Sequence, residues 1–196
     1  MLDLNSKKLY LASKSPRRAQ LLKLIGLPFE VIDSHYDESD ETYTIPEVQV
    51  MELAQKKAVK VAENIKEGLI VGADTVVVLE NDILGKPAHA DEALKMLLQL
   101  SGRTHTVYTG FALVDKPSEM MHSDFQRTRV TFRKIHQHEI EHYIKTDNPL
   151  DKAGAYGIQD KSAIFVEKID GCFYNVVGFP LTKFYLSLSA FLNKIY

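Results

Sequence analysis

The hydrophobic and polar positions of the chain follow two alternating patterns. Short runs that are apolar throughout are typical of buried strands, and apolar residues spaced three or four apart are typical of helices with one buried face. Strands are predicted at residues 9–12, 29–32, 69–79, 83–84, 106–114, 124–132, 163–169 and 173–177, the last two joined by an Asp-Gly hairpin turn. Helices are predicted to begin near residues 16, 46, 91, 138 and 180 and to end near residues 26, 67, 102, 146 and 195.

The first predicted helix follows a short strand and a polar turn. Ser15 suits the N-cap of this helix, because its hydroxyl can accept a hydrogen bond from the first helical turn. Arg17 and Arg18 then occupy the turn where the helix dipole favours acidic residues. With the hydroxyls of Ser13 and Ser15 and the free backbone N–H groups, these arginines indicate an anion site, for which phosphate is the usual ligand. Solvated arginines on a surface loop fit the pattern equally well.

Asp74 lies in the middle of a long apolar run. Such a run predicts a central strand covered on both faces, where an ionised and unpaired carboxylate is very costly. Asp74 therefore needs a cation, hydrogen-bond donors or a proton, which makes it the strongest candidate functional residue. Gly72, two residues earlier, predicts either a β-bulge or a close approach of another backbone segment. The alternative is a structural aspartate that accepts hydrogen bonds from nearby N–H groups.

Two lysines and one glutamate are further candidates. Lys57 falls on the apolar stripe of the second predicted helix, whereas Lys56 is expected in solvent; a Lys57 side chain that extends to the surface is the alternative. If residues 83–84 pair with the preceding strand, Lys86 is a candidate counter-ion for the buried aspartate or a ligand of phosphate. Glu38 belongs to an acidic segment that could bind a divalent cation, although such segments are more often only solvated.

The composition is that of one ordinary globular domain, or of a domain with two lobes. The 196 residues are 45% hydrophobic and carry a formal net charge of -2 with both signs interspersed, so the charge does not indicate nucleic-acid binding. Cys172 is the only cysteine, which excludes an internal disulfide and a cysteine-based zinc site and favours a reducing compartment. No stretch has the pattern of a signal peptide or a membrane-spanning segment, so we expect a cytoplasmic protein without membrane contacts.

His138, Glu139 and His142 match the His-Glu-x-x-His pattern of zinc metalloproteases. In that pattern two histidines one helical turn apart bind zinc, and the glutamate acts as the base. The predicted helix is short, however, and Ile140 and Tyr143 already define its buried face, with no obvious third ligand. We therefore interpret the two histidines as surface residues and keep a zinc metalloprotease as a rival hypothesis.

Four stretches of the chain, taken together, carry a resemblance to a known family. They are residues 11–18 (LASKSPRR), 72–76 (GADTV), 85–87 (GKP) with 100–105 (LSGRTH), and 151–159 (DKAGAYGIQ). Their order and spacing resemble those of the Maf nucleotide pyrophosphatases, also called septum-formation proteins. The resemblance covers nearly the whole chain, to about residue 181.

The resemblance implies one domain over residues 1–196 with an α/β fold. That fold has a mixed central β-sheet flanked by helices and two lobes with a cleft, similar to the inosine-triphosphate pyrophosphatases. The implied activity is hydrolysis of nucleoside triphosphates, here dTTP, UTP and modified pyrimidine nucleotides, to the monophosphate and pyrophosphate. A divalent metal cation, Mg²⁺ or Mn²⁺, is the implied cofactor, and a homodimer is the implied assembly.

The resemblance also assigns roles in phosphate binding and catalysis. Ser15 and Arg18 match the phosphate-binding loop of the family. Lys57 and Lys86 match its two functional lysines, and Asp74 matches the residue that accepts the proton. A triphosphate is densely charged, so these residues are expected to act by positioning and electrostatic stabilisation.

The resemblance assigns the choice of substrate to three further positions. Arg17, Thr75 and Gln159 match the combination of the branch acting on dTTP and UTP, whereas the sister branch acting on 7-methyl-GTP would carry a bulky residue, Gln and Glu there. Asp74 and Glu38 are the expected metal ligands, since Mg²⁺ prefers carboxylate and phosphate oxygens. A nucleotide-binding regulator of cell division that uses the same site without turnover is the rival that is not an enzyme.

Overall fold

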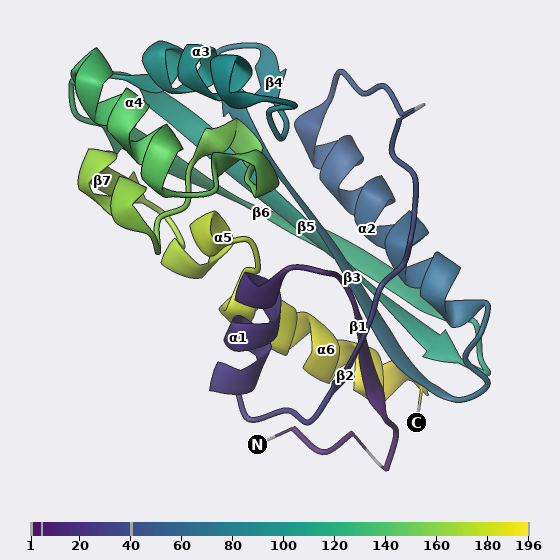
Figure 1. Ribbon diagram of the computed structural model, residues 1–196. Helices are drawn as coiled ribbons and strands as arrows, with labels where there is room; N and C mark the ends of the chain where they lie inside the picture. The colour runs from purple at the N-terminus through teal and green to yellow at the C-terminus, as the bar shows by residue number, and fades with distance from the viewer. Residues whose placement is uncertain (1, 5, 40, 196) are drawn as a thin grey trace. The chain divides into compact units, whose positions relative to one another are not determined.

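The computed structural model describes residues 2–4, 6–39 and 41–195. Within these residues, seven strands form one sheet in the order β2-β1-β3-β5-β6-β7, with β4 paired to β3 (Figure 1). The strands are β1 (Leu9–Ala12), β2 (Glu30–Ile32), β3 (Gly68–Leu79), β4 (Asp82–Leu84), β5 (Thr104–Lys116), β6 (Met121–Phe132) and β7 (Val166–Asp170). β1 is parallel to β2 and β3, while the pairs β3–β4 and β6–β7 are antiparallel. The expected α/β fold with a mixed sheet is confirmed.

Helices lie at the five predicted positions, although some of their ends differ from the prediction. They are α1 (Pro16–Leu24), α2 (Pro46–Ala62), α3 (Ala90–Leu100), α4 (Gln137–Thr146), α5 (Phe173–Val177) and α6 (Leu181–Ile195), with short 3₁₀ helices η1 (Pro149–Asp151), η2 (Ala153–Ala155) and η3 (Lys161–Phe165). Helix α2 ends at Ala62 and not near residue 67. Gly68 opens β3 with a φ of 140°, a conformation that favours glycine.

The chain divides into two compact units. The first unit contains the residues up to 74, residues 109–126 and the residues from 178 onward, and the second contains residues 75–108 and 127–177. The long strands β3, β5 and β6 contribute residues to both units. The first unit contains α1, α2 and α6, and the second contains α3, α4 and α5.

In the first unit, even-numbered strand residues face helix α2, because successive side chains of a strand point to opposite faces. The buried cluster on this face contains Tyr10, Ala12, Ile70, Ala112 and Val114 of the strands and Ala54, Ala58, Val61 and Ala62 of α2. Gly72 and Gly110 have the same parity and leave room for the helix backbone. A Cβ at Gly72 would lie 2.0 Å from the Ala54 carbonyl oxygen, and one at Gly110 would lie 2.4 Å from that of Val50. Gly72 therefore marks a close backbone approach.

The odd-numbered residues of the same strands pack on the other side, against the C-terminal helix. The ring of Phe111 on β5 meets Phe184 of α6 edge to face, with the ring centroids 5.6 Å apart. Phe179, just before α6, lies 6.4 Å from Phe111 between centroids. All three rings are fully buried. Helix α6 packs on the sheet through this aromatic cluster.

The second unit has a core of its own. The cluster joins β3, β5 and β6 to α3, α4 and η3 through Val77, Leu79, Leu97, Leu100, Val107, Val130, Phe132, Ile140, Tyr143, Tyr156 and Phe165. His105 is buried within it, with its Nε2 atom 2.8 Å from the Tyr156 hydroxyl and its ring edge-on to Phe132. Burial lowers the pKa of His105 from 6.5 to about 4, since a charged imidazole would lose its hydration there.

This buried histidine predicts acid sensitivity of the fold. Between pH 6.5 and 4 the unfolded chain binds a proton at His105 that the folded chain does not bind, so stability falls as the pH falls. The free energy of unfolding is expected to decrease by about 3 kcal/mol from this group on going from pH 7 to pH 4. Urea unfolding of the native protein and of His105→Gln at both pH values measures the effect as a difference. An equal loss in both proteins would show that another group is responsible.

The strand predicted at residues 173–177 is wrong, because these residues form the short helix α5. The apolar residues Phe173 and Tyr174 that suggested a strand are partly exposed, while Asn175 is fully buried. The amide of Asn175 donates to the Val107 carbonyl and to the Thr128 hydroxyl, both at 3.0 Å. These long-range hydrogen bonds favour the helix and have no signal in the local pattern.

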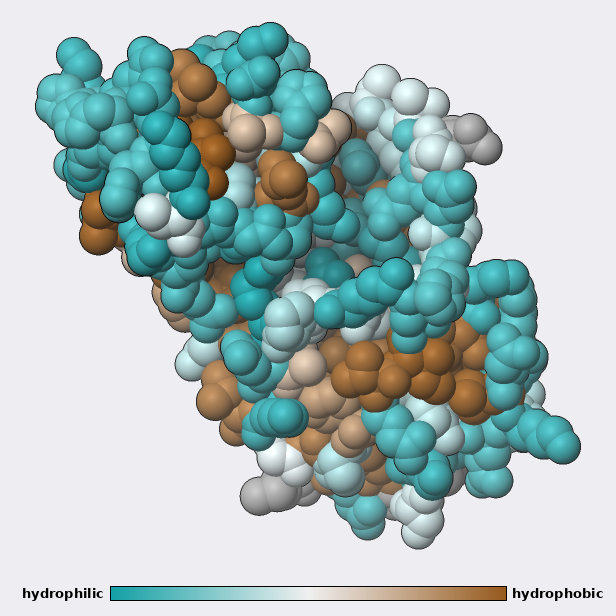
Figure 2. Space-filling model, in the orientation of Figure 1, coloured by the Kyte–Doolittle hydropathy of each residue, from teal (hydrophilic) through white to brown (hydrophobic). Residues whose placement is uncertain are grey.

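The surface is mainly hydrophilic on the face shown in Figure 2, with hydrophobic residues in separate patches. The most exposed large apolar side chains include Leu24, Ile164 and Leu186, which lie on different elements. None of the helices in the described part of the chain has the length and apolar composition needed to cross a membrane.

Candidate active site

A buried ion pair between Lys57 and Asp74 lies at the centre of the candidate site. Asp74 has the parity of Ile70 and Gly72, so its side chain faces α2 and meets Lys57 there. The Lys57 Nζ atom lies 2.7 Å from Asp74 Oδ1, and the two residues are 8% and 7% exposed. Lys57 is thus the cation that the buried carboxylate requires. The Lys57 side chain does not extend to the surface, which was the alternative.

Glu38 joins this pair from the acidic segment before α2. Its Oε1 atom lies 2.8 Å from Lys57 Nζ, and its side chain is partly exposed. One lysine ammonium group thus bridges two carboxylates, of which one is buried and the other reaches solvent. Such an arrangement concentrates charge at one point of the first unit, as expected of a site for an ionic ligand.

The turn before α1 has the geometry of an anion-binding loop. Ser15 is the N-cap, as predicted, and its hydroxyl oxygen accepts from the Arg18 N–H at 3.5 Å. The buried Ser13 hydroxyl oxygen accepts from the Ser15 N–H and from Arg18 Nη1, both at 3.2 Å. Arg18 Nε donates to the Gly178 carbonyl at 3.0 Å, so the guanidinium is held from two sides. Arg17 is half-buried on the same helical turn.

Electrostatics connect this loop to the ion pair. Burial lowers the pKa of the Arg18 guanidinium, while Asp74 and Glu38 act in the opposite direction and Arg17 adds to the lowering. Asp74, Glu38 and Arg18 therefore belong to one charged cluster of the first unit. The cluster combines a carboxylate, a bridging ammonium and a guanidinium at a helix N-terminus, which are groups suited to binding and hydrolysing a phosphate ester or anhydride.

The remaining candidates belong to the second unit. Thr75 is half-buried on β3, directly after Asp74. The β3–β4 hairpin is confirmed by the pairing of Val77 with Leu84, and the exposed Lys86 follows this hairpin. Gln159 is also exposed, in a turn after η2. The structure thus brings Ser13, Ser15, Arg18, Glu38, Lys57 and Asp74 together in the first unit, while Thr75, Lys86 and Gln159 are parts of the second.

Sequence reasoning missed a group of hydrogen bonds that holds the acidic segment to α2. Lys56 was expected in solvent, but its Nζ atom lies 2.6 Å from Glu41 and 3.0 Å from the Tyr43 hydroxyl. Glu41 also accepts from the hydroxyls of Tyr43, at 2.9 Å, and Tyr36. These hydrogen bonds, above all that of Lys56, lower the pKa of Glu41 to about 2. Lys56 and Lys57 therefore hold the acidic segment at two points, Glu41 and Glu38. The tyrosines that flank this segment were the only sequence feature that could have indicated these contacts.

Glu38 and Asp74 are the residues that could hold a metal. Their carboxylate oxygens already converge on one cation, the Lys57 ammonium group. This donor set fits a hard divalent cation, which would take its other ligands from phosphate oxygens and water. No group of three His, Cys, Asp or Glu side chains suited to a metal ion occurs within the described ranges. A cation at Glu38 and Asp74 would therefore depend on oxygens of the bound substrate.

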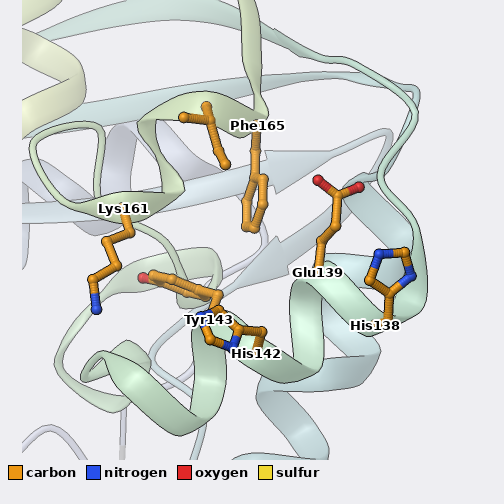
Figure 3. Close-up of a pocket in the computed structure, with 7 residues that line it drawn as sticks. His138, Glu139, His142, Tyr143, Lys161 and Phe165 are labelled. Atoms are coloured by element: carbon orange, nitrogen blue, oxygen red, sulfur yellow. The ribbon is translucent and has the colours of Figure 1, made fainter.

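The His-Glu-x-x-His residues lie elsewhere, on α4 in the second unit. His138, Glu139 and His142 line an open pocket of about 480 Å³ (Figure 3), and both histidines are exposed. Glu139 accepts from Arg133 at 2.6 and 3.1 Å and from the backbone N–H of His136 at 3.0 Å. Arg133 lowers the pKa of Glu139 to about 2. Because Glu139 is already engaged in capping α4, this geometry favours surface histidines over a protease centre.

Comparison with known proteins adds independent information. The dTTP/UTP pyrophosphatase of Bacillus cereus (strain G9842) is 48% identical over 185 residues, covering 94% of this chain and 96% of the relative. A Bacillus anthracis protein of the same name is 47% identical with the same coverage. Among solved structures, a HAM1 protein from Coxiella burnetii matches with a TM-score of 0.54 at 16% identity, over 94% of this chain and 99% of that chain, which is a likeness of fold.

The family model of the Maf-like proteins matches residues 8–191. The matched segment includes the anion loop, the Lys57–Asp74 ion pair and the turn that carries Gln159. By this match and by the identity to the Bacillus proteins, the chain belongs to the Maf-like protein family.

Proposed function

We propose that this protein hydrolyses nucleoside triphosphates, chiefly dTTP and UTP, to the nucleoside monophosphate and pyrophosphate. The observation that carries the proposal is the buried Lys57–Asp74 pair, joined electrostatically to Arg18 at the N-terminus of α1. The names of the Bacillus relatives support the same reaction and the same substrates. The fold alone would not support a particular reaction, because one fold hosts many activities.

In the proposed reaction, Asp74 accepts a proton from the attacking water. The water oxygen forms a bond to the α-phosphorus as the bond to pyrophosphate breaks, and the proton moves to the Asp74 carboxylate. Arg18, Lys57 and Lys86 bind phosphate oxygens and stabilise the charge that builds up on them. The Ser13 and Ser15 hydroxyls orient this loop by holding Arg18. Water attack requires the Asp74 carboxylate to be ionised, and Lys57 supplies its countercharge.

We propose Mg²⁺ or Mn²⁺ as the cofactor, held by Asp74 and Glu38. When bound, such a cation neutralises phosphate charge and makes a bound water more acidic. Lys57 would then contact the substrate and one carboxylate in place of bridging two.

We propose that Arg17, Thr75 and Gln159 select the base of the nucleotide. We also propose that the protein forms a homodimer, which sedimentation velocity would test.

The substrate assignment is tested by pyrophosphate release from a panel of nucleotides. The purified protein is incubated with Mg²⁺ or Mn²⁺ and dTTP, UTP, CTP, ATP, GTP or 7-methyl-GTP in parallel. Turnover should be confined largely to dTTP and UTP. Preference for 7-methyl-GTP would contradict the roles of Arg17, Thr75 and Gln159. A folded protein that binds nucleotide but turns over none of the panel would favour a regulator that only binds.

A further inference from the structure

The turn that carries Gln159 is closed by its own backbone. The N–H of Asp160 donates to the Gly157 carbonyl oxygen at 3.1 Å, so Gln159 is the third residue of a four-residue turn. The Gln159 side chain is exposed. An exposed glutamine has free rotamers, and an amide that reads a base needs a fixed backbone beneath it.

Ser162 fixes the first residue of this turn from below. Its hydroxyl oxygen accepts from the Gly157 N–H at 3.0 Å and lies 2.9 Å from the Gly157 carbonyl oxygen and 2.6 Å from Asp160 Oδ1, to one of which it donates. The backbone N–H of Ser162 donates to the same Asp160 atom at 2.8 Å. Ser162 has no exposed surface, so these hydrogen bonds do not compete with water.

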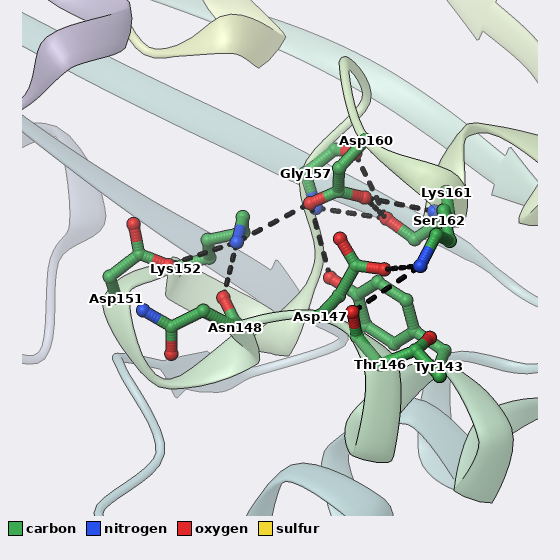
Figure 4. A network of polar contacts seen from close by, with 10 residues as sticks. All are labelled: Tyr143, Thr146, Asp147, Asn148, Asp151, Lys152, Gly157, Asp160, Lys161 and Ser162. Atoms are coloured by element: carbon green, nitrogen blue, oxygen red, sulfur yellow. Dashed lines mark hydrogen bonds and ion pairs between the residues drawn. The ribbon is translucent and has the colours of Figure 1, made fainter.

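Asp160 and Lys152 fix the last residue of the turn (Figure 4). The second carboxylate oxygen of Asp160 accepts from the Tyr143 hydroxyl at 3.2 Å and lies 3.3 Å from Lys152 Nζ. Lys152 is buried and also contacts Asp151, at 2.9 Å, and the Asn148 carbonyl oxygen. The loop between η1 and η3 is thus tied together by one ammonium group.

Ser162, Asp160 and Lys152 together form a polar clamp around the turn, and there is no space within this clamp for a side chain at position 157. A Cβ there would lie 2.7 Å from the second Asp160 carboxylate oxygen and 2.8 Å from Lys152 Cε. The glycine therefore allows the carboxylate and the lysine to pack directly against the turn. A turn that needed only to be short would not require these buried polar partners.

We propose that Ser162, Asp160 and Lys152 are positioning residues for substrate selection, which act by holding Gln159. This inference rests on the proposed function and deepens it, since it names the group that is read. The amide of Gln159 both donates and accepts, which matches the N3–H and O4 edge shared by uracil and thymine. Cytosine presents an acceptor and an amino group at the same edge, so the amide orientation that pairs with uracil or thymine would not pair with cytosine.

The test compares UTP and CTP as substrates of Ser162→Ala and Asp160→Ala. The ratio of kcat/KM for UTP to that for CTP should fall at least about fivefold in both variants, because one hydrogen-bond contact to the base is weakened. Lys161→Met is the matched control: Lys161 lies between the two residues but contacts Asp147, at 3.1 Å, and the Thr146 carbonyl oxygen. Its UTP to CTP ratio should equal that of the native protein.

A double-mutant cycle separates positioning from general damage. In a Gln159→Ala background, Ser162→Ala should leave the ratio unchanged, since the residue through which it acts is gone. A variant that melts like the native protein but loses activity equally on UTP and CTP would overturn the inference.

The dissociation constants of UMP and CMP, measured for the same variants, test the clamp separately. If the native protein released no pyrophosphate, the proposed function would fail, while a loss of UMP preference in Ser162→Ala would still support the clamp and an unchanged preference would overturn it.

Discussion

Asp74→Asn is expected to lower kcat for dTTP by about a thousandfold, because an amide cannot accept the proton from the attacking water. The change is nearly isosteric, so Lys57, 2.7 Å from the carboxylate in the native protein, keeps an oxygen to bond to. The dissociation constant for dTTP should therefore change only a few-fold. Single-turnover kinetics measure the chemical step, and calorimetry measures the binding of dTTP to the inactive variant.

Asp115→Asn is the matched control for this variant. Asp115 is also buried in the first unit and also pairs with a lysine, Lys7, but its other partner is the Ser118 hydroxyl, at 2.6 Å. Its substitution should lower stability and leave kcat close to that of the native protein. Native turnover by Asp74→Asn, or an equal loss of turnover in both variants, would remove Asp74 from the mechanism.

Gly72→Ala is expected to have the largest effect on stability. The new methyl group would lie 2.0 Å from the Ala54 carbonyl oxygen and 3.0 Å from the Ala58 nitrogen, so helix α2 would have to move away from β3. Overpacking against backbone costs about 3 kcal/mol, which corresponds to a decrease in Tm of roughly 6–12 °C in a chain of this size. Because α2 carries Lys57, activity should fall as well.

Gly85→Ala provides the comparison for this effect. An added Cβ at Gly85 has no heavy atom within 4 Å, so the melting temperature of this variant should stay within about 2 °C of the native value. Thermal unfolding followed by circular dichroism measures both variants. Equal melting temperatures for Gly72→Ala and Gly85→Ala would contradict the close packing of α2 on β3.

Most of the strand positions and the first helix could be predicted because their signals are local. The run from Leu69 to Leu79 is apolar apart from Asp74 and Thr75, and the structure covers both of its faces. Ser15 at the N-cap and the following proline define the start of α1 in two adjacent residues. The charge of Asp74 within a buried strand indicated that it needs a partner, but the counter-ion suggested from the sequence was Lys86, whereas in the structure the partner is Lys57.

The parts that failed depend on contacts between distant residues. Helix α5 replaces a predicted strand because Asn175 bonds to Val107 and Thr128, which lie far from it in sequence. The roles of Lys56 and Ser162 could not be assigned for the same reason, since a lysine beside solvent and a serine in a loop are ordinary until their partners are known. The substrate roles of Arg17, Thr75 and Gln159 stay predictions, supported by resemblance.

The central claim is tested most directly by the products formed from dTTP. The purified protein is incubated with dTTP and Mg²⁺, and the phosphorus-containing products are resolved by ³¹P NMR over time. We expect dTMP and pyrophosphate to appear in equal amounts, with no inorganic phosphate released early. Formation of dTDP and phosphate, or unchanged dTTP in the presence of folded protein that binds it, would contradict the assignment of a nucleoside triphosphate pyrophosphatase.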